Sequence, residues 1–262
     1  MPHKAGIAEV NGTHLQFEIA GSGHPLVLIH GFSLDGRMWD DQFFTFANNY
    51  RVLRYDMRGF GKSALPTTEE YSHVDDLVAL LDHVGLPKAH LVGLSLGGRV
   101  AIDTAIAHPT RVASLVPVDT VLQGYKWTSD DAGYIWKAAA ELGVATAKQL
   151  WLEHPYFTPA RRNPDVAYRL GNIIREYSGW HFVNQDPWRP LNPSALDQLH
   201  TITSPTKVLV GEKDLEDFHL ITSVIKSKVQ GSTSEVIADA GHMCNMEQPE
   251  LFNKAVLSFL PR

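Results

Sequence analysis

The chain has 262 residues, of which 44% are hydrophobic and 20% are charged, and its formal net charge at pH 7 is −6. This composition is typical of a folded globular protein and excludes disordered and fibrous classes. The chain carries no run of Lys and Arg suited to a phosphate backbone, so nucleic acid is not an expected partner.

The amino-terminal segment is predicted to form an antiparallel hairpin. Apolar residues alternate over 7–10 and 13–20, and Asn11-Gly12 between them is typical of a two-residue turn. The segment lacks the continuous apolar run of a secretory signal, and no stretch of the chain is apolar enough and long enough to cross a bilayer. We therefore expect a cytoplasmic protein without a membrane partner.

Short apolar runs and helical patterns alternate after the hairpin. The runs cover 26–29, 51–56, 90–93, 114–119, 207–211 and 234–239, and they are typical of strands buried on both faces. The helical patterns cover 71–84, 96–107, 218–228 and 250–260. A capping box formed by Thr67 and Glu70 is expected before the first of these helices. This alternation predicts an α/β fold with a mostly parallel sheet and helices on both faces.

The alternation breaks once, between Asp119 and Thr206, where roughly eighty residues contain no convincing strand run. We interpret 121–202 as a helical cap, and 1–120 with 203–262 as the core that carries it. Five of the six tryptophans lie in this insert. We expect most of its aromatic rings to pack the helices against the sheet, and a minority to line an apolar substrate pocket. The pocket candidates are Trp127, Trp136, Trp151, Trp180, Trp188 and Tyr125.

The most specific motif is G-x-S-x-G, which runs from Gly93 to Gly97 between a strand run and a helical pattern. In this context a sharp strand-to-helix turn pushes the serine hydroxyl out of the sheet, and the flanking glycines allow the backbone to pack closely. Ser95 is therefore the predicted nucleophile. The oxyanion formed by its attack would be stabilised by the backbone N–H groups of Leu96 and of Phe32.

A serine hydroxyl needs a neighbouring imidazole to remove its proton. His242 is the predicted base, because it follows the last strand run and precedes the final helix, at the carboxyl edge of the sheet. Asp214 follows the run before that and would hold the imidazole in one tautomer. Asp119 is the main alternative for the acid. Asp217 is a further rival, although it fits the start of the next helix better.

Other chemistries find no support in the sequence. Gly61-Lys62-Ser63 resembles the end of a phosphate-binding loop, but Asp56 stands where the first glycine belongs. The single cysteine, Cys244, excludes paired-cysteine metal sites and is interpreted as a packing residue, and no HExxH spacing occurs. We therefore expect neither a metal nor a cofactor.

With these motifs in place, the chain resembles the α/β-hydrolase family over nearly its whole length. The resemblance rests on LVLIHGF, YDMRGFGKS, LVGLSLGGRVA, VGEKD and AGHMCNMEQPE. It implies an eight-stranded, mostly parallel sheet with a helical cap inserted after the sixth strand, and a reaction through an acyl-enzyme. The substrates that it implies are small carboxylic esters or lactones.

Two alternatives remain open. HGFSLDGRMW and SLGGRVA are also similar to the pyruvate-eliminating lyase of the menaquinone pathway, in which an arginine at the position of Arg99 helps to bind a carboxylated substrate. An i,i+4 pair with Asp103 explains Arg99 equally well, and we prefer it. A small-molecule sensor with slow turnover is the other alternative. The sequence predicts no oligomeric state.

Overall fold

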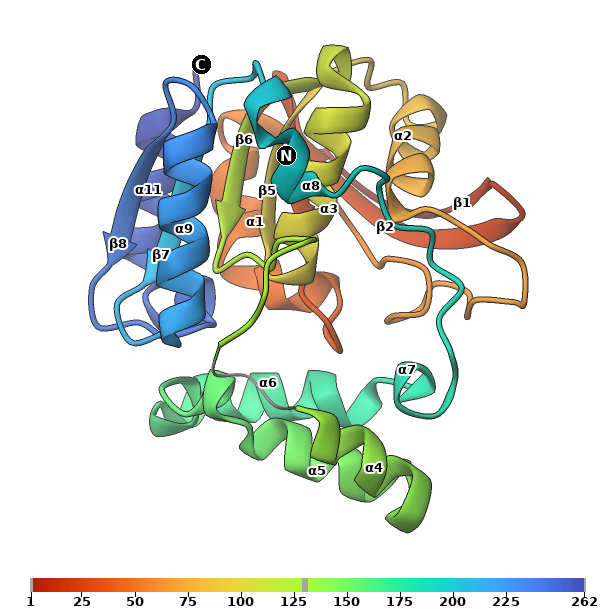
Figure 1. Cartoon of the computed structure of the whole chain (residues 1–262). Helices are drawn as coiled ribbons and strands as arrows, with labels where there is room; N and C mark the ends of the chain where they lie inside the picture. Colours follow the sequence, from red (N-terminus) through yellow and green to blue (C-terminus); the bar gives the residue numbers. More distant parts are fainter. Residues whose placement is uncertain (1, 129–131, 262) are drawn as a thin grey trace.

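The computed structural model describes residues 2–128 and 132–261, and its centre is one eight-stranded sheet (Figure 1). The strand order is β1-β2-β4-β3-β5-β6-β7-β8. The pairs β1·β2 and β2·β4 are antiparallel, and all the other neighbours are parallel. The strands are β1 (His3–Val10), β2 (Thr13–Gly21), β3 (His24–Ile29), β4 (Tyr50–Tyr55), β5 (Ala89–Leu94), β6 (Val112–Val118), β7 (Lys207–Gly211) and β8 (Thr233–Ile237). The α/β prediction is confirmed.

Burial explains the sequence patterns of these strands. Every residue of β5 is buried, since β5 lies at the centre of the sheet with a layer of helices on each face. The edge strand β1 is mostly exposed, and its turn to β2 uses Asn11 and Gly12, both with positive φ. The continuous apolar runs of the sequence therefore correspond to strands that are covered by helices on both faces of the sheet.

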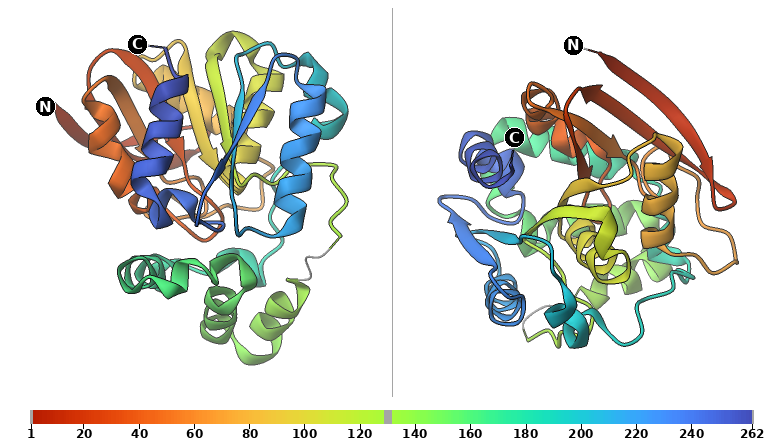
Figure 2. Two further views of the ribbon diagram at one scale, coloured as in Figure 1. Left: turned by 90° about the vertical axis from the view of Figure 1, so that its left-hand side faces the viewer. Right: turned by 90° about the horizontal axis from the view of Figure 1, so that it is seen from above.

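Helices cover both faces of the sheet. The helices α1 and α11 pack together on one face, and α2, α3 and α9 cover the other (Figure 2). The helices around the sheet are α1 (Asp40–Ala47), α2 (His73–His83), α3 (Leu96–Ala107), α9 (Glu216–Lys228), α10 (Cys244–Glu247) and α11 (Pro249–Phe259), together with α8 (Ala195–Gln198), which belongs to the insert by sequence but packs against α3.

The expected capping box at Thr67 and Glu70 is wrong. Helix α2 is capped by Ser72, whose hydroxyl accepts the backbone N–H of Asp75 at 3.2 Å. Thr67 instead accepts the N–H of Glu69, in a turn ahead of the helix. Both hydroxyls satisfy the local requirement for an N-cap, but Tyr71 between them pairs with the segment around Trp188 in an extended bridge, so the helix begins only after it.

The insert between β6 and β7 forms a separate helical layer below the carboxyl ends of the parallel strands (Figures 1 and 2). Its helices are α4 (Gly133–Leu142), α5 (Val144–Glu153), α6 (Pro164–Glu176) and α7 (Trp180–Val183). Because nucleophiles and bases of α/β folds lie at the carboxyl ends of strands, this layer faces the edge where the sequence motifs converge.

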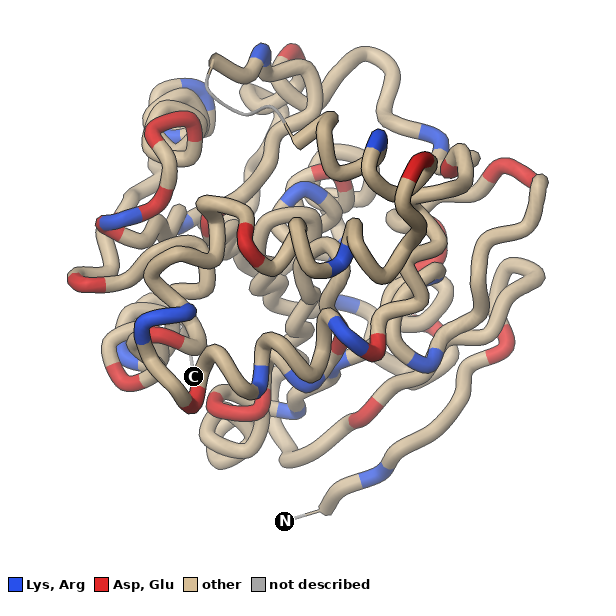
Figure 3. The backbone as a smooth tube through the Cα atoms, turned by 90° about the horizontal axis from the view of Figure 1, so that it is seen from below, with Lys and Arg blue, Asp and Glu red and all other residues tan. Residues whose placement is uncertain are grey.

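Basic and acidic residues are interspersed over the face seen from below the insert (Figure 3). Within the described residues, no helix has the length and the apolar character needed to cross a membrane.

Candidate active site

Ser95 occupies a sharp turn between β5 and α3. Its φ of 56° lies in the left-handed region, which costs a residue other than glycine conformational energy. The flanking glycines make the turn possible: a Cβ on Gly93 would collide with the carbonyl oxygen of Gly97, and a Cβ on Gly97 would collide with that of Ile29. The backbone N–H of Ser95 donates to Val118 at 2.9 Å, which fixes the turn against β6.

His242 and Asp214 form a buried pair at the ends of two neighbouring strands. Nδ1 of His242 lies 2.8 Å from Oδ2 of Asp214, and both side chains are at most 3% exposed. The other oxygen of Asp214 accepts the N–H of Leu215 at 2.8 Å. A carboxylate can only accept, so the imidazole proton is assigned to Nδ1 and Nε2 is left as an acceptor.

Three further residues hold His242 in place. The carboxylate of Glu247 accepts the N–H of Gly241 at 2.8 Å and that of Met243 at 3.1 Å, which are the two neighbours of His242 in the chain. The imidazole contacts the rings of Tyr156, at 4.7 Å, and Phe218, at 4.5 Å, and these two rings also contact each other at 5.4 Å. Glu247 therefore holds the backbone on both sides of His242, while Tyr156 and Phe218 hold its imidazole ring.

Asp119, the alternative acid, lies beside this pair without contacting the imidazole through a hydrogen bond. It is fully buried, and its Oδ1 accepts the N–H of Gly211 at 2.7 Å. Burial, together with the neighbouring Asp214 carboxylate, raises the pKa of Asp119 well above its usual range. Asp119, Asp214 and His242 each place one potential metal ligand within 4.8 Å of the others. Hydrogen bonds to Gly211 and between Asp214 and His242 already account for this grouping.

Asp217 has a different partner set and lies at the start of α9. Its Oδ1 accepts the hydroxyl proton of Tyr125 at 2.9 Å and that of Thr128 at 2.8 Å. It thereby anchors the chain that leads from β6 into the insert. The sequence-based preference for a helix-start position agrees with this geometry.

Ser95 and His242 line one cavity of about 260 Å³, called the Ser95 cavity from here on. Phe32 and Leu96, the predicted oxyanion donors, line it as well. Leu96 is the first residue of α3, where the N–H groups have no acceptor within the helix. The rest of the wall is largely apolar and consists of Gly31, Leu34, Leu94, Val121, Trp127, Ala132, Trp136, Trp151, Tyr156, Phe157 and Met243.

The model of the Alpha/beta hydrolase family matches residues 26–255, which is most of the chain. The chain belongs to the alpha/beta hydrolase family.

Relatives of this alpha/beta hydrolase carry several activities in their names. It is 28% identical to a Bacillus subtilis protein provisionally named 2-succinyl-6-hydroxy-2,4-cyclohexadiene-1-carboxylate synthase, over 90% of this chain and 89% of the relative. It is 26% identical to 3-oxoadipate enol-lactonase 1 of Acinetobacter baylyi, over 98% and 97%. Among solved structures, a thermophilic esterase from Thermogutta terrifontis is 28% identical, with a TM-score of 0.78 and coverage of 98% and 97%.

The aromatic pocket candidates of this alpha/beta hydrolase divide into two groups. Trp127, Trp136 and Trp151 line the Ser95 cavity. Trp180, Trp188 and Tyr125 do not: the first two line neighbouring cavities, and Tyr125 binds Asp217. Sequence reasoning did not select the wall residues Leu34, Val121, Tyr156, Phe157 and Met243. The adjacent aromatic pair Tyr156-Phe157 was the available signal.

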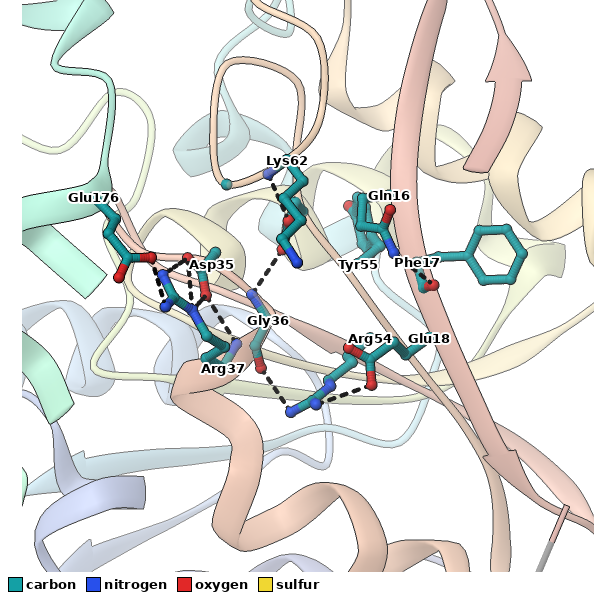
Figure 4. A pocket seen from close by; sticks show the side chains of 12 residues that line it. Gln16, Phe17, Glu18, Asp35, Gly36, Arg37, Arg54, Tyr55, Lys62 and Glu176 are labelled. Atoms are coloured by element: carbon teal, nitrogen blue, oxygen red, sulfur yellow. Dashed lines mark hydrogen bonds and ion pairs between the residues drawn. The ribbon is translucent and has the colours of Figure 1, made fainter. Parts of the chain in front are cut away.

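A polar cavity of about 230 Å³ is lined by residues of β2 and β4, of the segments that follow β3 and β4, and of α6 (Figure 4). Its charges pair with one another: Arg37 binds Asp35 at 2.7 Å and Glu176 at 2.8 Å, and Arg54 binds Glu18 at 3.0 Å. None of the predicted catalytic residues lines it. Because Glu176 belongs to α6, this network ties the insert to the core of the hydrolase.

Proposed function

We propose that this chain is a serine hydrolase that cleaves a carboxylic ester or lactone of a small, largely apolar substrate through an acyl-enzyme. One observation carries the proposal: Ser95, in a strained turn, and His242, paired with Asp214 at 2.8 Å, line the same apolar cavity. Enol-lactonase and esterase relatives support the reaction class. Residues 121–202 would act as the cap over a core of 1–120 and 203–262.

Acylation begins with attack of Ser95 Oγ on the substrate carbonyl carbon. His242 Nε2 takes the hydroxyl proton as the bond forms, and Asp214 stabilises the imidazolium that results. The backbone N–H groups of Phe32 and Leu96 stabilise the oxyanion, a contribution worth about 10²- to 10³-fold in rate per donor. His242 then returns the proton to the leaving alkoxide, and an ester of Ser95 remains.

Deacylation repeats the same steps with water as the nucleophile. His242 takes a proton from water as it attacks the acyl carbon, and the proton then passes to Ser95 Oγ as the ester bond breaks. In a lactone the leaving alkoxide and the acyl group belong to one molecule, so the product is a single hydroxy acid. The apolar walls favour uncharged substrates in both cases.

The test is steady-state hydrolysis of p-nitrophenyl esters with short to long acyl chains, by wild type and by Ser95→Ala. Rapid turnover that requires Ser95 supports the proposal and reports the length of the cavity. If the well-folded wild type hydrolyses none of these esters and none of a matching lactone series, the hydrolase proposal is wrong. Labelling by a fluorophosphonate probe that His242→Ala abolishes would support the role of the base.

A lyase of the menaquinone-pathway type, which HGFSLDGRMW and SLGGRVA also resemble, is the second candidate function. One relative is provisionally named 2-succinyl-6-hydroxy-2,4-cyclohexadiene-1-carboxylate synthase. Here Arg99 lies 3.5 Å from Asp103 and stacks on Trp188 at 3.8 Å, as expected for a packed ion pair. It does not line the Ser95 cavity. Pyruvate release from the lyase substrate, assayed beside ester hydrolysis, separates the two functions.

A further inference from the structure

A second cavity of about 280 Å³, called the side pocket, adjoins the Ser95 cavity. Phe32, Leu96 and Trp136 line both. The Phe32 ring lies between Trp151, a wall of the Ser95 cavity, at 5.5 Å, and His181, a wall of the side pocket, at 5.6 Å. Since Phe32 and Leu96 are the proposed oxyanion donors, a substrate held by them has room to extend in two directions.

The side pocket contains an unsatisfied hydrogen-bond donor on His181. The backbone N–H of His181 donates to the Tyr177 hydroxyl oxygen at 3.3 Å, and that hydroxyl lies 2.6 Å from His181 Nδ1. We assign the hydroxyl proton to the bond with Nδ1, since the hydroxyl oxygen already accepts one N–H, and this assignment places the imidazole proton on Nε2. Burial lowers the pKa of His181 to about 4, so the ring is neutral at pH 7.

No hydrogen-bond acceptor among the described residues reaches Nε2, although the residue is only 7% exposed. Oδ2 of Asp186 lies 3.6 Å away, which is beyond hydrogen-bond distance. A buried donor without a partner costs free energy, and a bound polar group would recover it. An acceptor bound in the side pocket beside Nε2 and Asp186 would make the hydrogen bond that the described residues leave unmade.

Asp186 supplies the complementary acceptor. Its Oδ1 accepts the backbone N–H of Trp188 at 3.1 Å, the Tyr71 hydroxyl hydrogen-bonds the same carboxylate, and Oδ2 lies 3.6 Å from His181 Nε2 with acceptor capacity remaining. A hydroxyl group both accepts and donates, so it can accept from Nε2 and donate to Oδ2 at once. A carboxylate would be repelled by Asp186, and an ammonium group cannot accept from Nε2. The aromatic walls, among them Phe60 stacked on His181 at 4.5 Å, suit the alkyl part of such a group.

We propose that the side pocket binds a neutral, hydroxyl-bearing arm of the substrate through His181 Nε2 and Asp186 Oδ2. The proposal rests on the hydrolase function proposed above and narrows its substrates to hydroxylated esters or lactones. The hydroxyl is recognised and takes no part in bond breaking. The two residues determine specificity and are not catalytic.

The test uses pairs of isosteric esters in which a terminal hydroxyl is replaced by methyl. One series places the hydroxyl on the acyl chain of p-nitrophenyl esters, and the other places it on the alcohol of butanoate esters, with short to long chains in each. Wild type is expected to show a kcat/KM about tenfold higher for the hydroxylated member of the best pair, which is the gain from one well-made hydrogen bond or two weak ones. Equal values throughout both series would overturn the proposal.

Two variants connect the preference to the residues. His181→Phe keeps a ring stacked on Phe60 and removes the Nε2 donor. Asp186→Asn keeps the shape of the side chain but replaces the Oδ2 acceptor by an amide NH2, which is a second donor beside His181 Nε2. Each is expected to bring the ratio within a pair close to one, and because the ratio compares two substrates of the same variant, it does not depend on how far the variant slows hydrolysis of the plain ester. His200→Phe, at an exposed histidine outside the pocket, is the matched control and keeps the ratio. A ratio that survives in folded Asp186→Asn and His181→Phe would overturn the assignment.

Titration of Ser95→Ala with the same pairs separates this proposal from the function on which it rests. It measures Kd without turnover, so it applies even if the wild type hydrolyses none of the esters. Tighter binding of the hydroxylated member, lost in Ser95→Ala/Asp186→Asn, supports the side pocket. Equal Kd values within every pair contradict it, whatever the outcome of the hydrolysis assay.

Discussion

Asp119 and Asp214 each place a carboxyl oxygen within 4.8 Å of the other's and of His242, yet only Asp214 hydrogen-bonds the imidazole. Two buried carboxyl groups at this separation cannot both ionise without a large cost. Burial and the Asp214 charge raise the pKa of Asp119 well above its usual range. This raised pKa favours the neutral form of Asp119, and Asp214 is the residue that pairs with the imidazole.

Because the two residues have different roles, the same substitution, Asp→Asn, should have a small effect on activity at Asp119 and a large one at Asp214. Asp119→Asn keeps a neutral group and the oxygen that accepts the Gly211 N–H, so kcat/KM should change only a few-fold. Asp214→Asn removes the charge that stabilises the imidazolium, and kcat should fall by about 10³- to 10⁴-fold. Ester hydrolysis by the two purified variants checks this. The reverse order of effects would make Asp119 the catalytic acid.

The same pair predicts how stability depends on pH. Because the pKa of Asp119 is raised on folding, the native state keeps a proton that the unfolded chain loses above about pH 3.9. The stability that Asp119 contributes therefore falls as the pH rises above about 3.9, and Asp119→Asn lacks that fall. Denaturant unfolding of both proteins at acidic and neutral pH should show the variant gaining relative stability toward neutral pH. If the difference in unfolding free energy between the two proteins does not depend on pH, folding does not raise the pKa of Asp119.

Ser95 should show a conflict between activity and stability. Its φ of 56° costs about 1–2 kcal/mol for a residue with a Cβ, whereas glycine adopts it freely but loses about 0.5–1 kcal/mol of chain entropy. Ser95→Gly should therefore be more stable than Ser95→Ala by about 1 kcal/mol. Both variants should lack ester turnover. Urea unfolding measures the difference, and equal midpoints would mean that the turn stores no strain.

Glu247 should act on the position of His242 and not on the chemistry. Glu247→Leu leaves the N–H groups of Gly241 and Met243 without their acceptor, which should cost about 2 kcal/mol or more in unfolding free energy. Displacement of the base should lower kcat by about tenfold or more with little change in KM. Glu247→Gln keeps one acceptor and should lie between wild type and the leucine variant. Wild-type kcat in a destabilised Glu247→Leu would contradict the positioning role.

Trp136 lines the Ser95 cavity while 38% of it faces solvent. Trp136→Ala should enlarge the cavity and move the preferred acyl chain to a greater length. The stability loss should be about 1–2 kcal/mol, below the 3–5 kcal/mol typical of a fully buried tryptophan. Tyr134→Ala, on the same helix but outside the cavity wall, is the control. An unchanged chain-length profile in Trp136→Ala would exclude this residue from the acyl site.

Local patterns were sufficient to predict the fold. Parallel strands covered on both faces produce apolar runs such as 90–93, and β5 is entirely buried. The turn at Ser95 was equally predictable, because the steric demands at Gly93 and Gly97 are local. The start of α2 was not, since Thr67 and Ser72 are both adequate caps and only the packing of the helix distinguishes them.

Longer-range features could not be read from the chain. Asp119 and Asp214 both follow a buried strand, and only the structure shows which one meets the imidazole. The placement of the aromatic residues depends on how α4–α7 pack, so Trp180 and Tyr125 could not be separated from Trp151 by composition. The sequence did not single out His181, because its contact with Tyr177 and the missing hydrogen-bond partner of its Nε2 depend on how the insert folds.

The position of Phe32 constrains how this protein can evolve. Its amide belongs to the core loop after β3, while its ring contacts Trp136, Trp151, Tyr177, His181 and Phe182, all from the insert. A replacement insert that changed these aromatic contacts would shift the backbone amide of Phe32 together with its ring. New substrate ranges are therefore accessible through changes that preserve the cage around Phe32, and wholesale exchange of the helical layer would impair reaction and recognition together.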